Sequence, residues 1–131
     1  MKRIAFSLII VLILGLLFLA SMMFSGAPPY VTTNDATNIN ATEAVLNGNL
    51  HDFGTAWSAE VYFVWGTTHD GPYPNKTTPQ EMSTREAFSF NLTGLSIDTT
   101  YYFKAKAVCS LFNGTDYGDE KMFTTKGTEM R

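Results

Sequence analysis

Residues 95–105, Leu95-Ser96-Ile97-Asp98-Thr99-Thr100-Tyr101-Tyr102-Phe103-Lys104-Ala105, carry the strongest structural signal in the sequence. From Tyr101 to Ala107, apolar or small side chains alternate with tyrosine and lysine. A repeat of two residues is the pattern of a β-strand that buries one face and exposes the other. The stretch therefore predicts a half-buried strand that begins near Tyr101.

Similar short segments occur on both sides of this stretch, and no segment after Tyr30 has the 3.6-residue apolar repeat of a helix. Strands are expected at residues 42–50, 60–65, 88–92 and 117–125, with a short one around Tyr73 inside a long surface connection, 69–87. Short strands without intervening helices predict an all-β, antiparallel, two-layer sandwich of about seven strands.

The sandwich needs an apolar core, because a single cysteine, Cys109, cannot form an intramolecular disulfide. Cys109 itself is expected to be a small core residue, with intermolecular pairing as the alternative. Each large apolar side chain contributes roughly 1.5–3 kcal/mol when fully buried. The expected core consists of Leu46, Leu50, Phe63, Trp65, Phe88, Phe90, Leu92, Leu95, Tyr101 and Phe103.

The stretch 95–105 resembles the passage into the sixth strand of fibronectin type III domains, where the family commonly reads Leu-x-Pro-x-Thr-x-Tyr. Tyr101 matches the family's tyrosine corner, in which the phenol hydroxyl bonds to the chain a few residues upstream. Ile97 stands where the family usually has proline. The resemblance implies an immunoglobulin-like, fibronectin type III sandwich.

Further segments similar to microbial members of this family are 44–48, 62–68 and 117–125, so the resemblance covers about residues 30–125. Leu46 replaces a tryptophan common in animal members, and Trp65 is expected to serve as the bulky core aromatic instead. Such modules serve as spacers, adhesins and accessory units, so the resemblance does not assign a function.

Residues 4–24 are almost entirely Ile, Leu, Val, Phe, Met, Ala and Gly, without a charge. A helix of this length, at about 1.5 Å per residue, matches a hydrocarbon layer about 30 Å thick. Lys2 and Arg3 precede it and favour a cytoplasmic N-terminus. We expect a single-pass signal-anchor in the cell membrane; cleavage after Ala27, giving a secreted domain, is the alternative, which Pro28 disfavours.

These features divide the chain into a signal-anchor or transmembrane segment (1–26), a proline spacer (27–30), the fibronectin type III-like domain (30–125) and a C-terminal tail (126–131). The formal net charge is −3; without Lys2 and Arg3, seven basic residues oppose twelve acidic ones, a net charge of −5. An acidic surface argues against a nucleic-acid partner and against docking on anionic lipid by charge.

The candidate contact residues are Leu111 and Phe112, which are expected at a loop tip, either exposed to a partner or folded back over the sandwich end. Four Asn-x-Thr sequons are candidate glycosylation sites, with the asparagines Asn40, Asn75, Asn91 and Asn113. Of these, Asn75 and Asn113 are expected in loops.

No catalytic, cofactor or metal site is expected. His51-Asp52 and His69-Asp70 each place two metal-ligand types together, but a zinc site needs three or four converging ligands, so solvated surface is the interpretation. The sequence contains no Gly-x-Ser-x-Gly elbow and no phosphate-binding glycine loop. The protein is therefore expected not to be an enzyme.

The expected function is a membrane-anchored extracytoplasmic module for surface interaction, adhesion or spacing. Its partner would be another surface protein or a glycan, with lipid contact through residues 4–24 and self-association as a further option. The alternatives are a subunit of a pilin-like filament and a secreted accessory domain of a polysaccharide-degrading system.

Overall fold

The computed structural model describes residues 26–109 and 114–128, and within them the chain forms nine antiparallel strands. The strands are β1 Tyr30–Thr37, β2 Ala44–Asp52, β3 Ala59–Gly66, β4 Asn75–Lys76, β5 Gln80–Met82, β6 Ala87–Leu92, β7 Thr100–Cys109, β8 Gly114–Tyr117 and β9 Lys121–Thr124.

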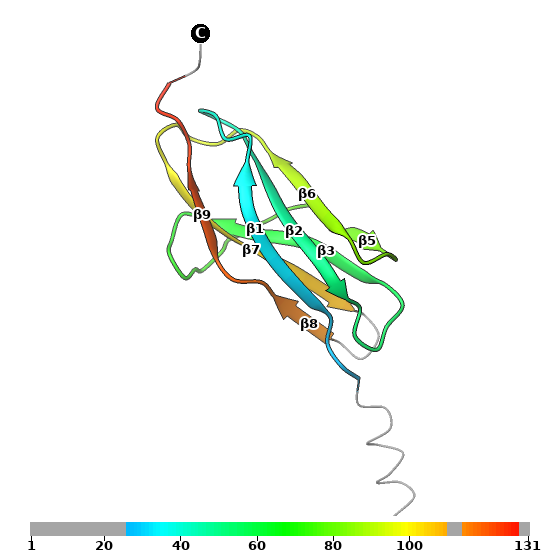
Figure 1. Cartoon of the computed structure of the whole chain (residues 1–131). Helices are drawn as coiled ribbons and strands as arrows, with labels where there is room; N and C mark the ends of the chain where they lie inside the picture. Colours follow the sequence, from blue (N-terminus) through cyan, green and yellow to red (C-terminus); the bar gives the residue numbers. More distant parts are fainter. Residues whose placement is uncertain (1–25, 110–113, 129–131) are drawn as a thin grey trace, which may run out of the picture.

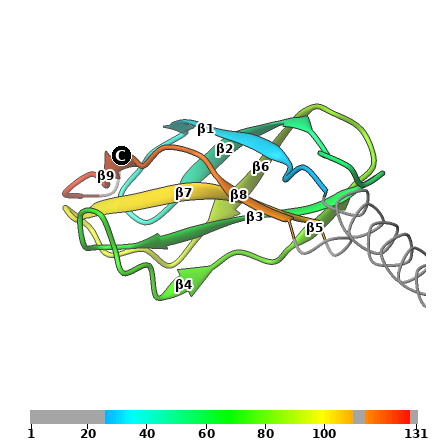
Figure 2. The same cartoon turned by 90° about the horizontal axis from the view of Figure 1, so that it is seen from below.

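Two sheets lie face to face as separate layers, which are seen most clearly from below in Figure 2. The first sheet has three strands in the order β1-β2-β6. The second has six: β3 and β7 form its centre, β4 and β5 both pair with β3, and β8 and β9 both pair with β7. The expected all-β two-layer sandwich is confirmed.

The core lies between the two sheets, because the strands turn alternate side chains inward. Eight of the ten expected core residues are buried, whereas Trp65 and Phe90 are partly buried and pack against the core. Trp65, expected as the bulky core aromatic, packs against the core from a partly buried position, and Phe63 and Phe103 are the largest fully buried side chains. Trp65 lies next to the end of β3, where its ring meets Tyr101 edge-on at 5.7 Å.

The stretch that leads into β7 is held by Tyr101. Its ring is buried and stacks on Phe123 with centroids 5.5 Å apart. Its hydroxyl accepts a hydrogen bond from the backbone N–H of Ser96 at 2.9 Å. This is the geometry of a tyrosine corner, which ties the connection before β7 to the core.

The strands differ from the sequence expectation in four places. β1 was not expected, because only Val31 and Thr33 of its eight residues are buried and it therefore carries little apolar signal. The short strand near Tyr73 is β4, two residues further on, and β5 is a second strand inside the connection expected at 69–87. Of the expected strand at 117–125, residues 121–124 form β9, whereas Tyr117 is the last residue of β8. The two strands are separated where Gly118 donates from its N–H to Ala105 O and approaches Thr33 so closely that a Cβ would lie 2.3 Å from its hydroxyl oxygen.

Cys109 is buried, and its thiol donates to the carbonyl of Phe53 at 3.1 Å. Burial raises the pKa of this thiol, and the charge of Glu81 adds to the effect. A buried, protonated thiol fits the core interpretation and not intermolecular pairing.

The described chain begins at one end of the sandwich and its last residues lie at the other (Figure 1). Across residues 26–109 and 114–128 there is no helix of the length and hydrophobicity that a membrane span requires. The expected anchor at 4–24 lies outside the described residues, as do Leu111, Phe112 and Asn113.

Tyr101→Phe should lower the free energy of unfolding by about 1–2 kcal/mol, because the Ser96 N–H loses its acceptor while the ring still fits. The matched control is Tyr102→Phe on the same strand, whose hydroxyl has no hydrogen-bond partner within the described part of the chain and whose replacement should change stability by less than about 0.5 kcal/mol. Urea unfolding measures both, and equal effects would contradict a role for the hydroxyl.

Candidate functional site

A row of tyrosine and lysine side chains crosses the outer face of the six-stranded sheet. The strand register places Tyr62 of β3 opposite Lys106 of β7, and Lys106 opposite Tyr117 of β8. The ammonium nitrogen of Lys106 lies 5.3 Å from the ring centroid of Tyr62 and 5.1 Å from that of Tyr117. Hydrogen bonding to Tyr62 and then to Tyr117 raises the pKa of Lys106, against the effect of burial.

Two more lysines extend this pattern. Lys76 of β4 lies over the ring of Tyr62 at 5.8 Å, and Lys104 of β7 lies over the ring of Tyr73 at 5.6 Å. Lys76 and Tyr117 are exposed, and the other members are half-buried. We call these six side chains the Tyr–Lys face: Tyr62, Tyr73, Tyr117, Lys76, Lys104 and Lys106.

The Tyr–Lys face is a basic region on an acidic domain. Three of the seven basic residues that follow residue 26 belong to it, although the chain beyond Lys2 and Arg3 carries a net charge of −5. Each ammonium group over a ring contributes about 0.5–1 kcal/mol at an exposed site. The rings also hold the ammonium groups in place while leaving donors available, so the face can bind an anionic group beside a flat ring.

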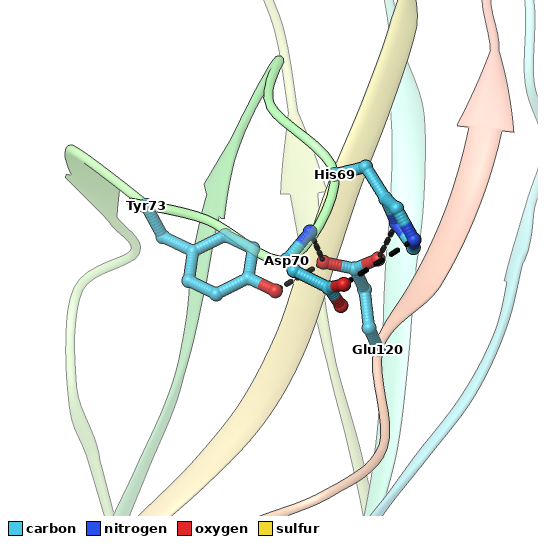
Figure 3. A network of polar contacts seen from close by, with 4 residues as sticks. All are labelled: His69, Asp70, Tyr73 and Glu120. Carbon is cyan, nitrogen blue, oxygen red and sulfur yellow. Dashed lines mark hydrogen bonds and ion pairs between the residues drawn. The ribbon is translucent and has the colours of Figure 1, made fainter.

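A partly buried carboxylate holds one side of this face in position. Glu120, in the connection between β8 and β9, has a side chain only 12% exposed. Its Oε2 accepts hydrogen bonds from the Tyr73 hydroxyl and, at 2.8 Å, from the Asp70 N–H. Its Oε1 lies 2.6 Å from Nδ1 of His69. Figure 3 shows these residues of the 69–73 segment gathered around the Glu120 carboxylate. We call this set the Glu120 network.

The Glu120 network shifts the ionisation of its members. Burial alone would raise the pKa of Glu120, but the hydrogen bonds from Tyr73, from the backbone of Asp70 and from His69 outweigh it, so the pKa lies below its ordinary value. Burial raises the pKa of Tyr73, and its bond to Glu120 raises it further. Glu120 is therefore a charged acceptor at neutral pH and Tyr73 a neutral donor.

The loop between β3 and β4 follows a tight path that brings its donors to Glu120. Asp70 and Gly71 have φ values of 62° and 82°, in the left-handed region, and the Gly71 N–H donates to Thr68 O at 3.0 Å. The His69 ring lies 5.4 Å from that of Tyr102 on β7. The network therefore fixes the loop against the sheet and sets Tyr73 beneath Lys104.

The side chains of His69 and Asp70 are exposed, as expected of solvated surface, but they have a partner that the sequence did not indicate. Glu120, fifty positions away, joins them, and the ligand atoms of the three lie within 4.8 Å of one another. Such a set has the donor types of a metal site. Oε2 of Glu120, however, accepts hydrogen bonds from Asp70 and Tyr73, and Oε1 is bonded to the His69 ring. We therefore interpret the cluster as a loop anchor. His51 lies elsewhere, stacked on Tyr30.

The candidate glycosylation sites differ in accessibility. Asn40 is half-buried, and its Oδ1 accepts from the Thr42 and Glu43 N–H groups at 3.0 and 2.8 Å. Asn91 is exposed on β6. Asn75 is exposed too, but it lies in the edge strand β4 and not in a loop. Its side-chain amide donates to the Trp65 carbonyl at 3.4 Å.

Sequence reasoning missed both the Tyr–Lys face and Glu120. The alternation of Tyr102, Lys104 and Lys106 did indicate an exposed strand face, yet only the strand register sets Lys106 between two rings. Glu120 carries no local signal, because its partners are about fifty residues away. Both features depend on residues that are far apart in the sequence, so a local sequence pattern could not reveal them.

The fold has counterparts among solved structures. The sensor domain of the anti-sigma factor RsgI4 from Pseudobacteroides cellulosolvens matches with a TM-score of 0.62 at 18% identity, covering 76% of each chain. A shorter form of that domain matches with 0.59 at 19% identity, over 78% of this chain and 98% of that one. The fibronectin type III domain of human KIAA0970 protein gives 0.53 at 16%, over 77% and 76%.

No family model and no curated protein matches the sequence. At identities below 20%, the structural matches establish a fold and nothing further. The chain is a fibronectin type III-like β-sandwich that resembles the RsgI4 sensor domain. The names of these neighbours, a sensor domain and a fibronectin type III domain, do not describe enzymes.

Glu120→Gln should lower the free energy of unfolding by about 1–3 kcal/mol at pH 7, because an amide accepts weaker hydrogen bonds than a carboxylate. The folded-state pKa of Glu120 is depressed, so its contribution is present above about pH 4.3, the ordinary value, and is lost as pH falls through the folded pKa. Urea unfolding should therefore show a smaller difference between mutant and wild type at pH 3 than at pH 7.

The control is Asp35→Asn, which removes an exposed carboxylate paired with Lys121 at 3.3 Å. Exposed pairs contribute at most about 1 kcal/mol. If Glu120→Gln had no larger effect than this control at pH 7, Glu120 would not be a loop anchor.

Zinc at about 100 µM should raise the melting temperature by less than about 1 °C, because zinc would have to displace the hydrogen bonds that Glu120 already accepts. Thermal unfolding with zinc and with a chelator measures this. A rise of several degrees that Glu120→Gln abolishes would replace the loop-anchor interpretation with a metal site.

Proposed function

We propose that the protein is a non-enzymatic, membrane-anchored extracytoplasmic module whose Tyr–Lys face binds a carboxylate-bearing surface glycan. The observation that carries the proposal is the row Tyr62, Lys106 and Tyr117, in which a cation is held between two accessible rings. The proposal assigns a partner to a surface module that the fold alone leaves without one.

The chemistry of the face favours an anionic sugar. A flat ring offers an apolar surface for the C–H groups of a sugar ring, and an adjacent ammonium group offers donors for a carboxylate. Lys106, next to Tyr117, provides both groups side by side, and Lys76 and Lys104 supply further donors.

Other partner classes fit the face less well. A nucleic acid carries a dense row of phosphates and requires a broad basic surface, whereas this domain has a net charge of −5 outside its first residues. Protein interfaces usually have an apolar core with few charged groups. The centre of the Tyr–Lys face consists of rings and ammonium groups instead.

The membrane part of the proposal rests on residues 4–24, whose length and lack of charge suit a bilayer span. The Glu120 network supports a binding role for the face, because a fixed Tyr73 and Lys104 lose less conformational entropy when a ligand binds. A pilin-like subunit and a secreted accessory domain remain the competing proposals. Filaments lost on gene deletion would favour the first, and release from the cell would favour the second.

Lys106→Met should weaken binding of the full-length chain to polygalacturonate by about tenfold, because it removes the central cation and keeps an unbranched apolar side chain only one atom shorter. Isothermal titration with polygalacturonate and with an uncharged glucan provides the measurement. Binding should weaken as salt rises, because the contact is ionic.

The matched control is Lys126→Met, the same substitution at an exposed lysine beyond β9 and outside the Tyr–Lys face. If both variants lost the same affinity for polygalacturonate, the loss would come from the change in net charge and not from the Tyr–Lys face. Equal binding of the uncharged glucan, or binding only to an acidic protein, would overturn the choice of a carboxylated glycan.

A further inference from the structure

A tryptophan side chain is exposed to solvent on a loop whose other residues pack against the core or form hydrogen bonds. Trp57, in the connection between β2 and β3, is 86% exposed. Its neighbours Phe53 and Ala56 pack against the core. The single S–H of Cys109 on β7 lies within hydrogen-bonding distance of carbonyls on both sides of the loop, Phe53 at 3.1 Å and Ser58 at 3.4 Å. The loop therefore presents Trp57 outward on a supported backbone.

This loop is bonded to the segment through which the described chain begins. The Ala27 N–H donates to the Thr55 hydroxyl at 2.6 Å, and the Thr55 N–H donates back to the Ala27 carbonyl at 3.2 Å. Gly54 has φ of 69°, and a Cβ there would lie 2.2 Å from the Ala27 carbonyl oxygen. The two backbones thus lie in direct contact at one end of the sandwich (Figure 1).

The distance along the chain from this contact to the apolar segment is short. Ala27 follows Phe24, the last residue of that segment, by three positions, which span at most about 11 Å. The polar layer on each side of a bilayer is about 5–8 Å thick. If residues 4–24 span the bilayer, Trp57, two positions after Thr55, is within reach of this layer.

The chemistry of Trp57 matches that layer. An indole ring combines a large apolar body with one N–H donor, and tryptophan is enriched at the boundary between headgroups and acyl chains. The domain is acidic, so attraction to anionic lipid does not explain a membrane contact. Insertion of an aromatic side chain does not require charge on the lipid, so zwitterionic lipid is sufficient.

We infer that Trp57 inserts into the headgroup region of the membrane that holds the anchor, giving the domain a second, orienting contact with the bilayer. The inference rests on the proposed membrane anchoring. The anchor and Trp57 then hold the same end of the sandwich, formed by Ala27, Thr55 and Trp57, at the membrane surface. The opposite end, which carries Ile97, then points away from the membrane.

The test uses the full-length chain in phosphatidylcholine vesicles. The sequence has two tryptophans, so Trp65→Phe leaves Trp57 as the only one. Its fluorescence should be quenched by lipid brominated near the headgroup end of the acyl chains. It should be about threefold less sensitive to aqueous acrylamide than a tryptophan placed at the far end. Trp65→Tyr serves as a second background if the Phe variant unfolds.

The control combines Trp57→Phe, Trp65→Phe and Ile97→Trp, which moves the only tryptophan to an exposed position in the connection before β7. That residue should respond to acrylamide and not to brominated lipid. If Trp57 responded like position 97, the inference would be overturned.

Flotation of the vesicles after an alkaline wash tests the proposed membrane anchor separately from the insertion of Trp57. A chain that floats with lipid, but whose Trp57 is open to acrylamide, keeps its anchor and loses the inferred contact. A chain that does not float lacks the anchor, which overturns both. Flotation together with brominated-lipid quenching of Trp57 supports both.

Discussion

The structure depends on a continuous row of aromatic contacts between the two sheets. Phe88 of the three-stranded sheet meets Phe63 at 5.1 Å, Phe63 meets Phe103 at 6.1 Å, and Phe103 meets Phe123 at 6.0 Å. Tyr101 continues the row at 5.5 Å from Phe123. Because the chain has one cysteine, this packing stabilises the fold without the intramolecular disulfide that many small secreted domains contain.

Hydrogen bonds at the side of the sandwich also join the two sheets, in addition to the aromatic contacts. The buried hydroxyl of Thr33 on β1 accepts from the Ala105 N–H at 3.0 Å, and Asp116 accepts from the Val31 N–H at 2.9 Å. Both bonds join the first strand to the opposite sheet and satisfy groups that would otherwise lose their hydration. The apolar interior thus sets the distance between the sheets, and these bonds set their alignment. That rigid frame supports the outward row of tyrosines and lysines.

Most of the sandwich could be predicted where local pattern and burial agree. β2, β3, β6 and β7 alternate clearly, because both the inner and the outer face of each strand have a distinct chemistry. β1 could not be predicted this way, since it buries Thr33 through a hydrogen bond and not through an apolar surface. The break between β8 and β9 arises from a close backbone approach at Gly118, which no local pattern encodes.

The sequence by itself determined the fold class, the strand through Tyr101 and the composition of the core, because those depend on side-chain periodicity within short segments. It also determined that lysines and tyrosines share the outer side of β7. Tertiary structure alone decided that Lys106 lies between Tyr62 and Tyr117, that Glu120 accepts hydrogen bonds from residues 69–73, and that the loop carrying Trp57 is bonded through Thr55 to the start of the domain. Each of those depends on which distant segments become neighbours, and strand register and chain path set that only when the whole sandwich has formed.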